Sequence, residues 1–263
     1  MSSPRLPRPV HLRSAAPGLP RRMVLTAAVA GLGLATSGRA LWAQEGGEAG
    51  EGAALEGLSE KLAFLTELGL FESQILIVQA LEAEGKPDLA RQHLEETHHA
   101  SYDEVAEGIA QTGTPDFRAE ADAFAAAVAS DAGAEAVTAT AGALLARIAD
   151  LRHMAGDKDR MQAVEALLRH SAEDLEAGVS AGAVELPQEY RDSWGFTMVA
   201  LEWLEELAAD KEPDVAEAAQ SALATKADVL AQYAGIDTPT TPGDAGALLA
   251  AAARVELAAF RLN

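Results

Sequence analysis

The sequence predicts an all-α fold, an antiparallel helical bundle built from long helical hairpins, with about eight helices. Apolar residues recur at three- and four-residue spacing through most of the chain after residue 58. No stretch shows the sustained alternation of β-branched and polar residues that is typical of strands. The breaks between helical segments are short, so consecutive helices should pack side by side and antiparallel.

The first two predicted helices form such a hairpin. Residues 58–84 carry apolar residues at helical spacing, from Leu62 to Val78. Gly85-Lys86-Pro87-Asp88 ends this helix, and proline suits the first turn of the next one. We expect the second helix to run unbroken from Pro87 to about Gln111, and a shorter third helix to follow Pro115.

Five further segments complete the predicted bundle. An alanine-rich helix covers residues 134–155, and the next one begins at Asp157 after a glycine. Pro187 opens a sixth helix, and Pro213 opens a seventh that ends near Tyr233. The loop at residues 235–243 is rich in glycine, proline and threonine, and a final helix spans residues 245–262.

Residues 1–43 have the composition of an export signal. They contain six arginines and no acidic residue, followed by the short apolar run Met23–Leu34 and then small residues. Arg21-Arg22 resembles the twin-arginine export motif, with Val24 where that motif usually has phenylalanine. We expect cleavage after Ala40 or Ala43 and a soluble periplasmic protein. No later segment is expected to be long and apolar enough to span a membrane, so none should insert stably.

The remaining chain is strongly acidic. Residues 44–57 are rich in glycine and glutamate and predict a flexible acidic linker, which leaves residues 58–263 as a single helical domain. Six of the 20 basic residues and none of the 41 acidic ones lie in residues 1–43, so the rest of the chain has a formal charge of −27. This charge disfavours nucleic acid as a partner and favours cations. The absence of cysteine excludes disulfides and thiolate metal sites.

A histidine cluster in the second helix is the candidate metal site. His93, His98 and His99 lie close together with Glu95. At about 100° per residue, His98 falls inside the apolar stripe of one straight helix, whereas His93 and His99 flank it on opposite sides. Glu95 precedes His98 by one turn, the spacing found in carboxylate–histidine metal ligands.

Glu72 in the first helix is the expected partner of His98. It lies at the centre of an apolar stripe, where an isolated carboxylate is costly. The short turn at residues 85–88 should bring Glu72 and His98 to similar heights in the hairpin. Two interpretations need this same geometry: a structural Glu–His ion pair, or a metal site that includes Glu72, His98, His93, His99 and Glu95.

The other histidines are not candidate ligands, and the aromatic residues have two interpretations. His153 and His170 are expected to face solvent, away from the apolar stripes of their helices. The sequence contains no glycine-rich phosphate loop, no nucleophile elbow and no HExxH motif. An aromatic group on the sixth helix suggests either core packing or a flat ligand such as haem. It consists of Tyr190, Trp194, Phe196 and Trp203.

Two stretches resemble known families. Residues 175–199 resemble the helix–loop–helix of the periplasmic part of high-affinity iron permeases, with matches at Val179, Gly182, Val184, Glu189, Tyr190, Asp192 and Phe196. Residues 69–77 and the segment of His93 and His99 resemble uncharacterised exported helical proteins of proteobacteria. In that family a histidine stands at the position of Gln74 and a proline at that of Ala100. Both resemblances imply a helical periplasmic protein, and the first implies iron.

These observations leave two functions open. The first is a periplasmic protein that binds or handles a transition metal, iron by resemblance and zinc or copper equally by ligand chemistry. The second is a non-catalytic helical scaffold that docks a protein partner and whose histidines are structural. We expect no enzymatic activity, because no nucleophile, base and oxyanion donor occur together.

Overall fold

The computed structural model describes residues 59–262 with the exception of Asp131, and the side chain of His98 is also outside the described part. The expected signal (1–43) and linker (44–57) therefore lie outside the described residues. Within this range the chain is all-α, as predicted. The only strands there are β1 (Val179–Ser180) and β2 (Ala183–Val184), a two-residue antiparallel pair with Val179 opposite Val184.

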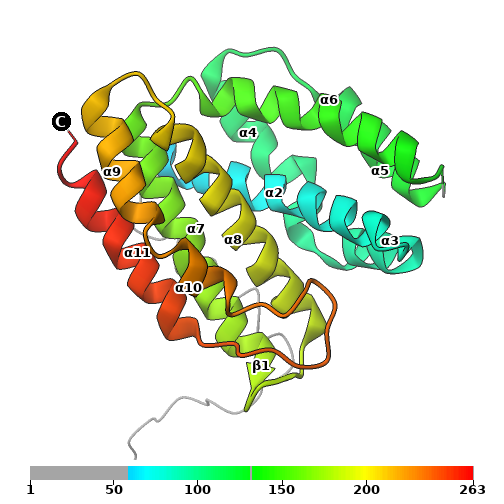
Figure 1. The fold of residues 1–263 in the computed structure, drawn as a ribbon. Coiled ribbons are helices and arrows are strands. Elements are labelled where there is room, and N and C mark those ends of the chain that lie inside the picture. Colours follow the sequence, from blue (N-terminus) through cyan, green and yellow to red (C-terminus); the bar gives the residue numbers. More distant parts are fainter. Residues whose placement is uncertain (1–58, 131, 263) are drawn as a thin grey trace, which may run out of the picture. The chain divides into compact units, whose positions relative to one another are not determined.

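Ten α-helices and one 3-10 helix occupy the described residues (Figure 1). They are α2 (Glu60–Ala83), α3 (Pro87–Glu96), η1 (His98–Ala100), α4 (Tyr102–Thr112), α5 (Arg118–Ala129), α6 (Ala134–Arg152), α7 (Asp157–Gly178), α8 (Pro187–Ala208), α9 (Pro213–Leu223), α10 (Lys226–Leu230) and α11 (Ala245–Ala259).

Helix α2 lies between two groups of helices. It packs against α7 and α8 on one side and against α3, α4 and α6 on the other (Figure 1). Its side chains accordingly divide between two hydrophobic cores: Leu65 and Leu70 belong to one, and Phe71, Ile75 and Val78 to the other. A helix buried on several sides is apolar around its whole circumference.

By length and composition alone, α2 is apolar enough to cross a membrane. Our expectation that no segment after the leader would meet that test is therefore wrong. Its most apolar stretch is 67% buried between the two cores, however, so the hydropathy of α2 is accounted for by its place in the interior.

Two glycines allow α2 to approach its neighbours closely. A Cβ at Gly195 in α8 would lie 2.5 Å from Cδ1 of Ile77, and a Cβ at Gly69 in α2 would lie 2.7 Å from Cδ1 of Leu167. A side chain at either position would require the facing side chain, Ile77 or Leu167, to move. The backbones of α2, α7 and α8 therefore approach one another closely at these two points.

Helices α7, α8, α9 with α10, and α11 form a four-helix bundle (Figure 1). A buried group of hydroxyls lies inside it: the Tyr233 hydroxyl contacts Ser193 Oγ at 2.7 Å, Thr197 Oγ1 at 2.9 Å and Ser171 Oγ at 3.1 Å. Burial raises the pKa of Tyr233 to about 12, so the phenol remains neutral. These bonds tie the segment after α10 to α7 and α8.

Two predicted helices are broken. The expected helix from Pro87 to Gln111 ends at Glu96, passes through η1 and restarts as α4. Thr97 is extended (φ −86°, ψ 133°), and the Ser101 side chain accepts a hydrogen bond from the backbone N–H of Asp103 as the N-cap of α4. Ser101 with Glu104 is a capping-box sequence, a helix-start signal that our reading of one continuous helix missed. The expected seventh helix is likewise divided into α9 and α10.

Candidate functional site

Glu72 in α2 is buried, as predicted, and is 3% exposed. Its side chain is hydrogen-bonded to residues of α6 and α8. Arg152 at the end of α6 donates from Nη1 to both carboxylate oxygens at 3.0 Å, and the indole N–H of Trp203 in α8 donates to Oε2 at 3.0 Å. The expected partner was His98, whose side chain is not described. The carboxylate thus accepts three hydrogen bonds from two donor groups, Arg152 and Trp203, which the sequence did not predict.

Arg152 extends this group to the protein surface. Its Nη2 donates to both carboxylate oxygens of Glu206 at 2.6 and 2.7 Å, and its guanidinium lies 4.9 Å from the centre of the Trp203 ring. The exposed His153 lies 3.5 Å from Glu206, in agreement with its predicted solvent position. We call Glu72, Arg152, Trp203 and Glu206 the ionic cluster. One cation bridges two carboxylates and joins α2, α6 and α8.

The charge state of Glu72 follows from its contacts. Burial raises the pKa of Glu72 to about 7, while the positive charge of Arg152 acts in the opposite direction. The Glu72 carboxylate is the acceptor in all three hydrogen bonds described above, so a proton on the carboxyl group would break at least one of them. We therefore assign Glu72 as a carboxylate at neutral pH.

His93 is fully buried, although the helical wheel placed it beside the apolar stripe. Its Nε2 lies 2.6 Å from Oε1 of Gln74 in α2, and its Nδ1 lies 3.1 Å from Oε1 of Gln188 in α8. Both glutamines donate to the carboxylate of Asp192, Gln74 at 2.9 Å and Gln188 at 3.0 Å. We call His93, Gln74, Gln188 and Asp192 the amide cluster. It joins α2, α3 and α8.

The environment of the amide cluster keeps the imidazole neutral. Burial lowers the pKa of His93 to about 3, and the positive charge of Arg191 acts in the same direction. Arg191 is itself buried and donates to Oε1 of Gln188 at 3.3 Å. A neutral imidazole has one donor and one acceptor nitrogen, so the ring donates to Oε1 of only one of the two glutamines.

The remaining candidate ligands are separate from these clusters. His99 is half-buried and packs edge-to-face on Phe196, with ring centres 5.6 Å apart. Glu95 is exposed at the edge of a cavity of about 330 Å³ that Phe71, Phe124 and Leu144 also line. Among the side chains described, no three histidine, aspartate or glutamate residues are grouped as a metal site would require.

The sequence predicted the wrong environment for two histidines, His93 and His170. His93 was misplaced because one straight helix was assumed from Pro87 onward, and α3 packs against two neighbours, α2 and α5. His170 was expected to face solvent but is 1% exposed. The sequence did contain a signal for the amide cluster. Gln74 is a polar residue within the apolar stretch of α2, and a buried amide requires hydrogen-bond partners.

Three of the four aromatic residues in the α8 group lie in the core of the bundle, and Trp194 is half-buried against the other core. Tyr190, Phe196 and Trp203 are buried in the core of the bundle. The Tyr190 hydroxyl donates to the backbone carbonyl of Gly235 at 2.6 Å, and Trp203 is bonded to Glu72. These are the core positions that one of the two interpretations of the aromatic group predicted.

Residues 151–257 match the iron permease-associated 4-helix bundle domain. No curated protein and no solved structure matches the chain.

The match to the iron permease-associated 4-helix bundle domain begins at the end of α6 and extends through most of α11. It therefore includes α7, α8, α9 with α10, and most of α11, as well as Arg152, Trp203 and Asp192. It covers less than half of the chain and excludes α2 through α5. The resemblance of residues 175–199 to iron permeases is supported by this match, and Glu72, Gln74 and His93 lie outside it.

Proposed function

We propose that this chain serves an iron-transport system as a non-catalytic helical protein outside the cytoplasm. In this role it would handle iron together with a partner protein. Two observations support an iron-related role: the match of residues 151–257 to the iron permease-associated 4-helix bundle domain, and an acidic chain with a formal charge of −21. An acidic surface raises the local concentration of cations.

One observation favours a partner-assisted role over a resident ion in the interior. The two fully buried candidate ligands, Glu72 and His93, are already bonded to protein groups: Glu72 to Arg152 and Trp203, and His93 to two glutamines. A metal at either position would have to displace a cation or break the amide cluster. Both clusters are therefore assigned a structural role.

Iron uptake in the organism of origin tests this proposal. Deleting the gene should reduce uptake of radioactive iron under iron limitation, and the full chain should restore it, while zinc uptake stays unchanged as the control. Uptake of iron at the parental rate in the deletion strain would contradict the proposal.

A second candidate function is a resident metal site near η1. Two observations motivate it. Glu95 and Thr97 line the 330 Å³ cavity, and His99 follows Thr97 by two positions in the sequence. Anaerobic titration with Fe²⁺, followed by metal analysis, separates the two candidates. Stoichiometric binding that is lost in Glu95→Ala/His99→Ala would support the resident site, and zinc and copper titrations would establish its selectivity. Our first proposal predicts that this double variant restores iron uptake fully.

Export is the remaining part of the proposal. It rests on the arginine-rich leader, with its Arg21-Arg22 pair and following apolar run. Changing both arginines to lysine should retain the chain inside the cell if the twin-arginine route is used. Normal export of that variant would exclude this route, and retention of the unaltered chain in the cytoplasm would overturn the extracytoplasmic location.

A further inference from the structure

The outward face of α11 carries an apolar seam with heptad spacing. Its residues are separated by four, three, four and three positions, and all five are exposed: Gly246, Ala250, Ala253, Leu257 and Phe260. Alternating steps of three and four are the spacing by which one helix presents a continuous seam to another. The opposite face of α11, which includes Leu248 and Val255, is buried in the bundle.

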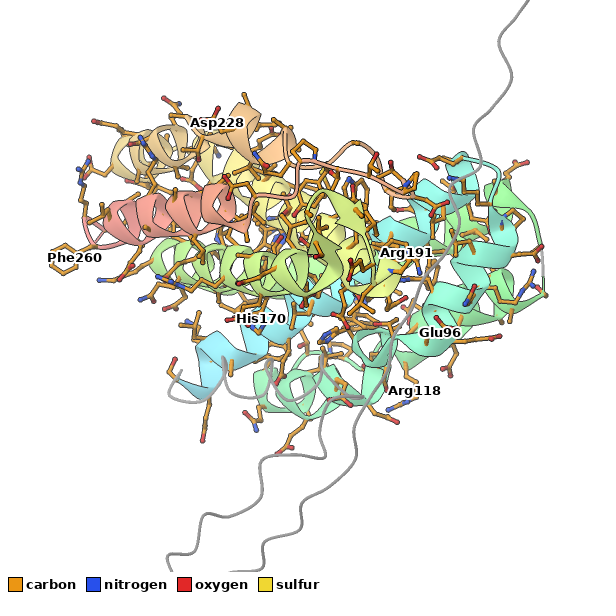
Figure 2. The ribbon with its side chains drawn as sticks, turned by 90° about the horizontal axis from the view of Figure 1, so that it is seen from below. Glu96, Arg118, His170, Arg191, Asp228 and Phe260 are labelled. Carbon is orange, nitrogen blue, oxygen red and sulfur yellow. The ribbon has the colours of Figure 1, made fainter. Side chains whose placement is uncertain are left out.

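This seam is unusually apolar for an exposed surface. Leu257 is 67% exposed and Phe260 is 85% exposed, and Phe260 projects away from the ribbon at the end of α11 (Figure 2). A groove of about 310 Å³ runs along the same face, lined by Ala250, Ala253 and Leu257 together with Ser221 of α9. Contiguous exposed apolar surface of this kind marks an interaction site.

The side chains along this face favour a second copy of the same helix as the occupant. The first half of the seam contains only glycine and alanine, with Leu249 (44% exposed) beside it, and the second half ends in leucine and phenylalanine. An antiparallel copy of the same helix, centred on Ala253, places Phe260 opposite the partner copy's small residue at position 246. It places Leu257 opposite the partner copy's Leu249, with the partner copy's alanine at 250 one residue away. We propose that α11 is the contact surface for a second copy of this chain, packed antiparallel about a two-fold axis at Ala253.

Charge on the face is compatible with this arrangement. The exposed charged residues from position 244 to 261 are Asp244, Arg254, Glu256 and Arg261, which sum to zero in a chain of formal charge −21. Two such acidic molecules therefore meet least repulsion through α11. The antiparallel register also brings Arg261 near Asp244 of the second copy, twice by symmetry. The two copies of Arg254 oppose each other near the axis, which weakens the pairing.

The expected dimer is weak and depends on concentration. Helix α11 has 15 residues, or about 22 Å of length at 1.5 Å per residue, and a single helix pair of this size buries less than a standard interface of about 1,600 Å². Phe260→Ser should raise the dimer dissociation constant at least tenfold in sedimentation analysis of the full chain. Met154→Ser is the matched control, because Met154 is 58% exposed but lies outside α11.

Disulfide trapping tests the antiparallel register directly, since the chain contains no cysteine. Ala250→Cys and Leu257→Cys chains of different tag length should cross-link to each other when mixed and oxidised. Neither should cross-link to itself, because identical positions are offset by about 10 Å along the axis, beyond the 4.4–6.8 Å Cα separation of a disulfide. Self-linking of each variant would indicate parallel packing and overturn the proposal. A monomer at all concentrations, or equal dimerisation of Phe260→Ser and the parent, would also overturn it.

Discussion

The ionic cluster and the amide cluster each include one residue of α2, Glu72 and Gln74, which are only two positions apart. The two clusters nevertheless satisfy their buried polar groups differently. The first matches two carboxylates with one guanidinium, Arg152. The second surrounds a neutral imidazole and one carboxylate with two glutamine amides. The ionic cluster should therefore be sensitive to the loss of its cation, and the amide cluster to pH.

Removing the cation should have the largest effect. Arg152→Met leaves the carboxylate of Glu72 buried without its counter-charge, and breaking a buried pair in this way costs about 3–5 kcal/mol of unfolding free energy. The double variant Glu72→Leu/Arg152→Met removes both charges and should recover most of that loss. Urea unfolding measures both, and a loss below about 1 kcal/mol in the single variant would contradict the assigned role.

Acid should weaken the amide cluster in particular. The pKa of His93 is lowered to about 3 in the folded chain from 6.5, so the unfolded chain binds more protons between these values. Stability should therefore fall as the pH falls from about 6.5 towards 3, by up to about 1.4 kcal/mol per pH unit from this group. His93→Gln should flatten the pH profile between pH 4 and 6. Identical profiles for His93→Gln and the parent would contradict the assignment.

Loss of one amide should have a smaller effect. Gln74→Leu removes a donor to Asp192 and the hydrogen-bond partner of His93 Nε2, which costs about 1–3 kcal/mol for buried groups left unsatisfied. Gln79→Leu on the same helix is the matched control, because Gln79 is half-buried at the edge of a surface cavity. Chemical denaturation of the two variants should separate them, and equal stability would show that the amide cluster contributes little.

Removal of one hydroxyl in the bundle should have the smallest effect. Tyr233→Phe keeps the ring and removes an OH group whose partners, Ser171, Ser193 and Thr197, also bond to one another or to backbone groups. A loss of about 1 kcal/mol is expected from thermal unfolding, in line with one neutral hydrogen bond. If Tyr233→Phe lost as much unfolding free energy as Arg152→Met, the hydroxyl group of the bundle would stabilise the fold as much as the ionic cluster, which would contradict this ranking.

The sequence predicted the helices of the bundle better than the partners of its buried polar groups. Hydrophobic periodicity predicted α7 and α8 closely, because each has a continuous stripe and a clear start, after Gly156 for α7 and at Pro187 for α8. It also predicted the burial of Glu72, since a carboxylate within such a stripe is evident on a helical wheel. The break at Thr97 was missed because periodicity continues across it, and the error moved His93 to the wrong environment.

The partners could not be predicted for a different reason. Glu72 and Arg152 are 80 positions apart, and Gln74 and Asp192 are 118 apart. Such contacts depend on the order in which helices pack, and a periodic pattern does not specify that order. A nearby histidine in the adjacent helix was therefore chosen in place of a distant arginine. Interior polar positions predict that a partner exists, but they leave its identity open.

The central claim is that Glu72 and His93 are structural ties and not metal ligands. Thermal unfolding of the unaltered chain and of His93→Gln, with and without a large anaerobic excess of Fe²⁺ at pH 7, tests it most directly. A ligand at one hundred times its dissociation constant stabilises the folded state by about 2.7 kcal/mol. The structural account predicts the same metal response in both proteins. Stabilisation by Fe²⁺ that occurs in the unaltered chain and is abolished in His93→Gln would contradict it.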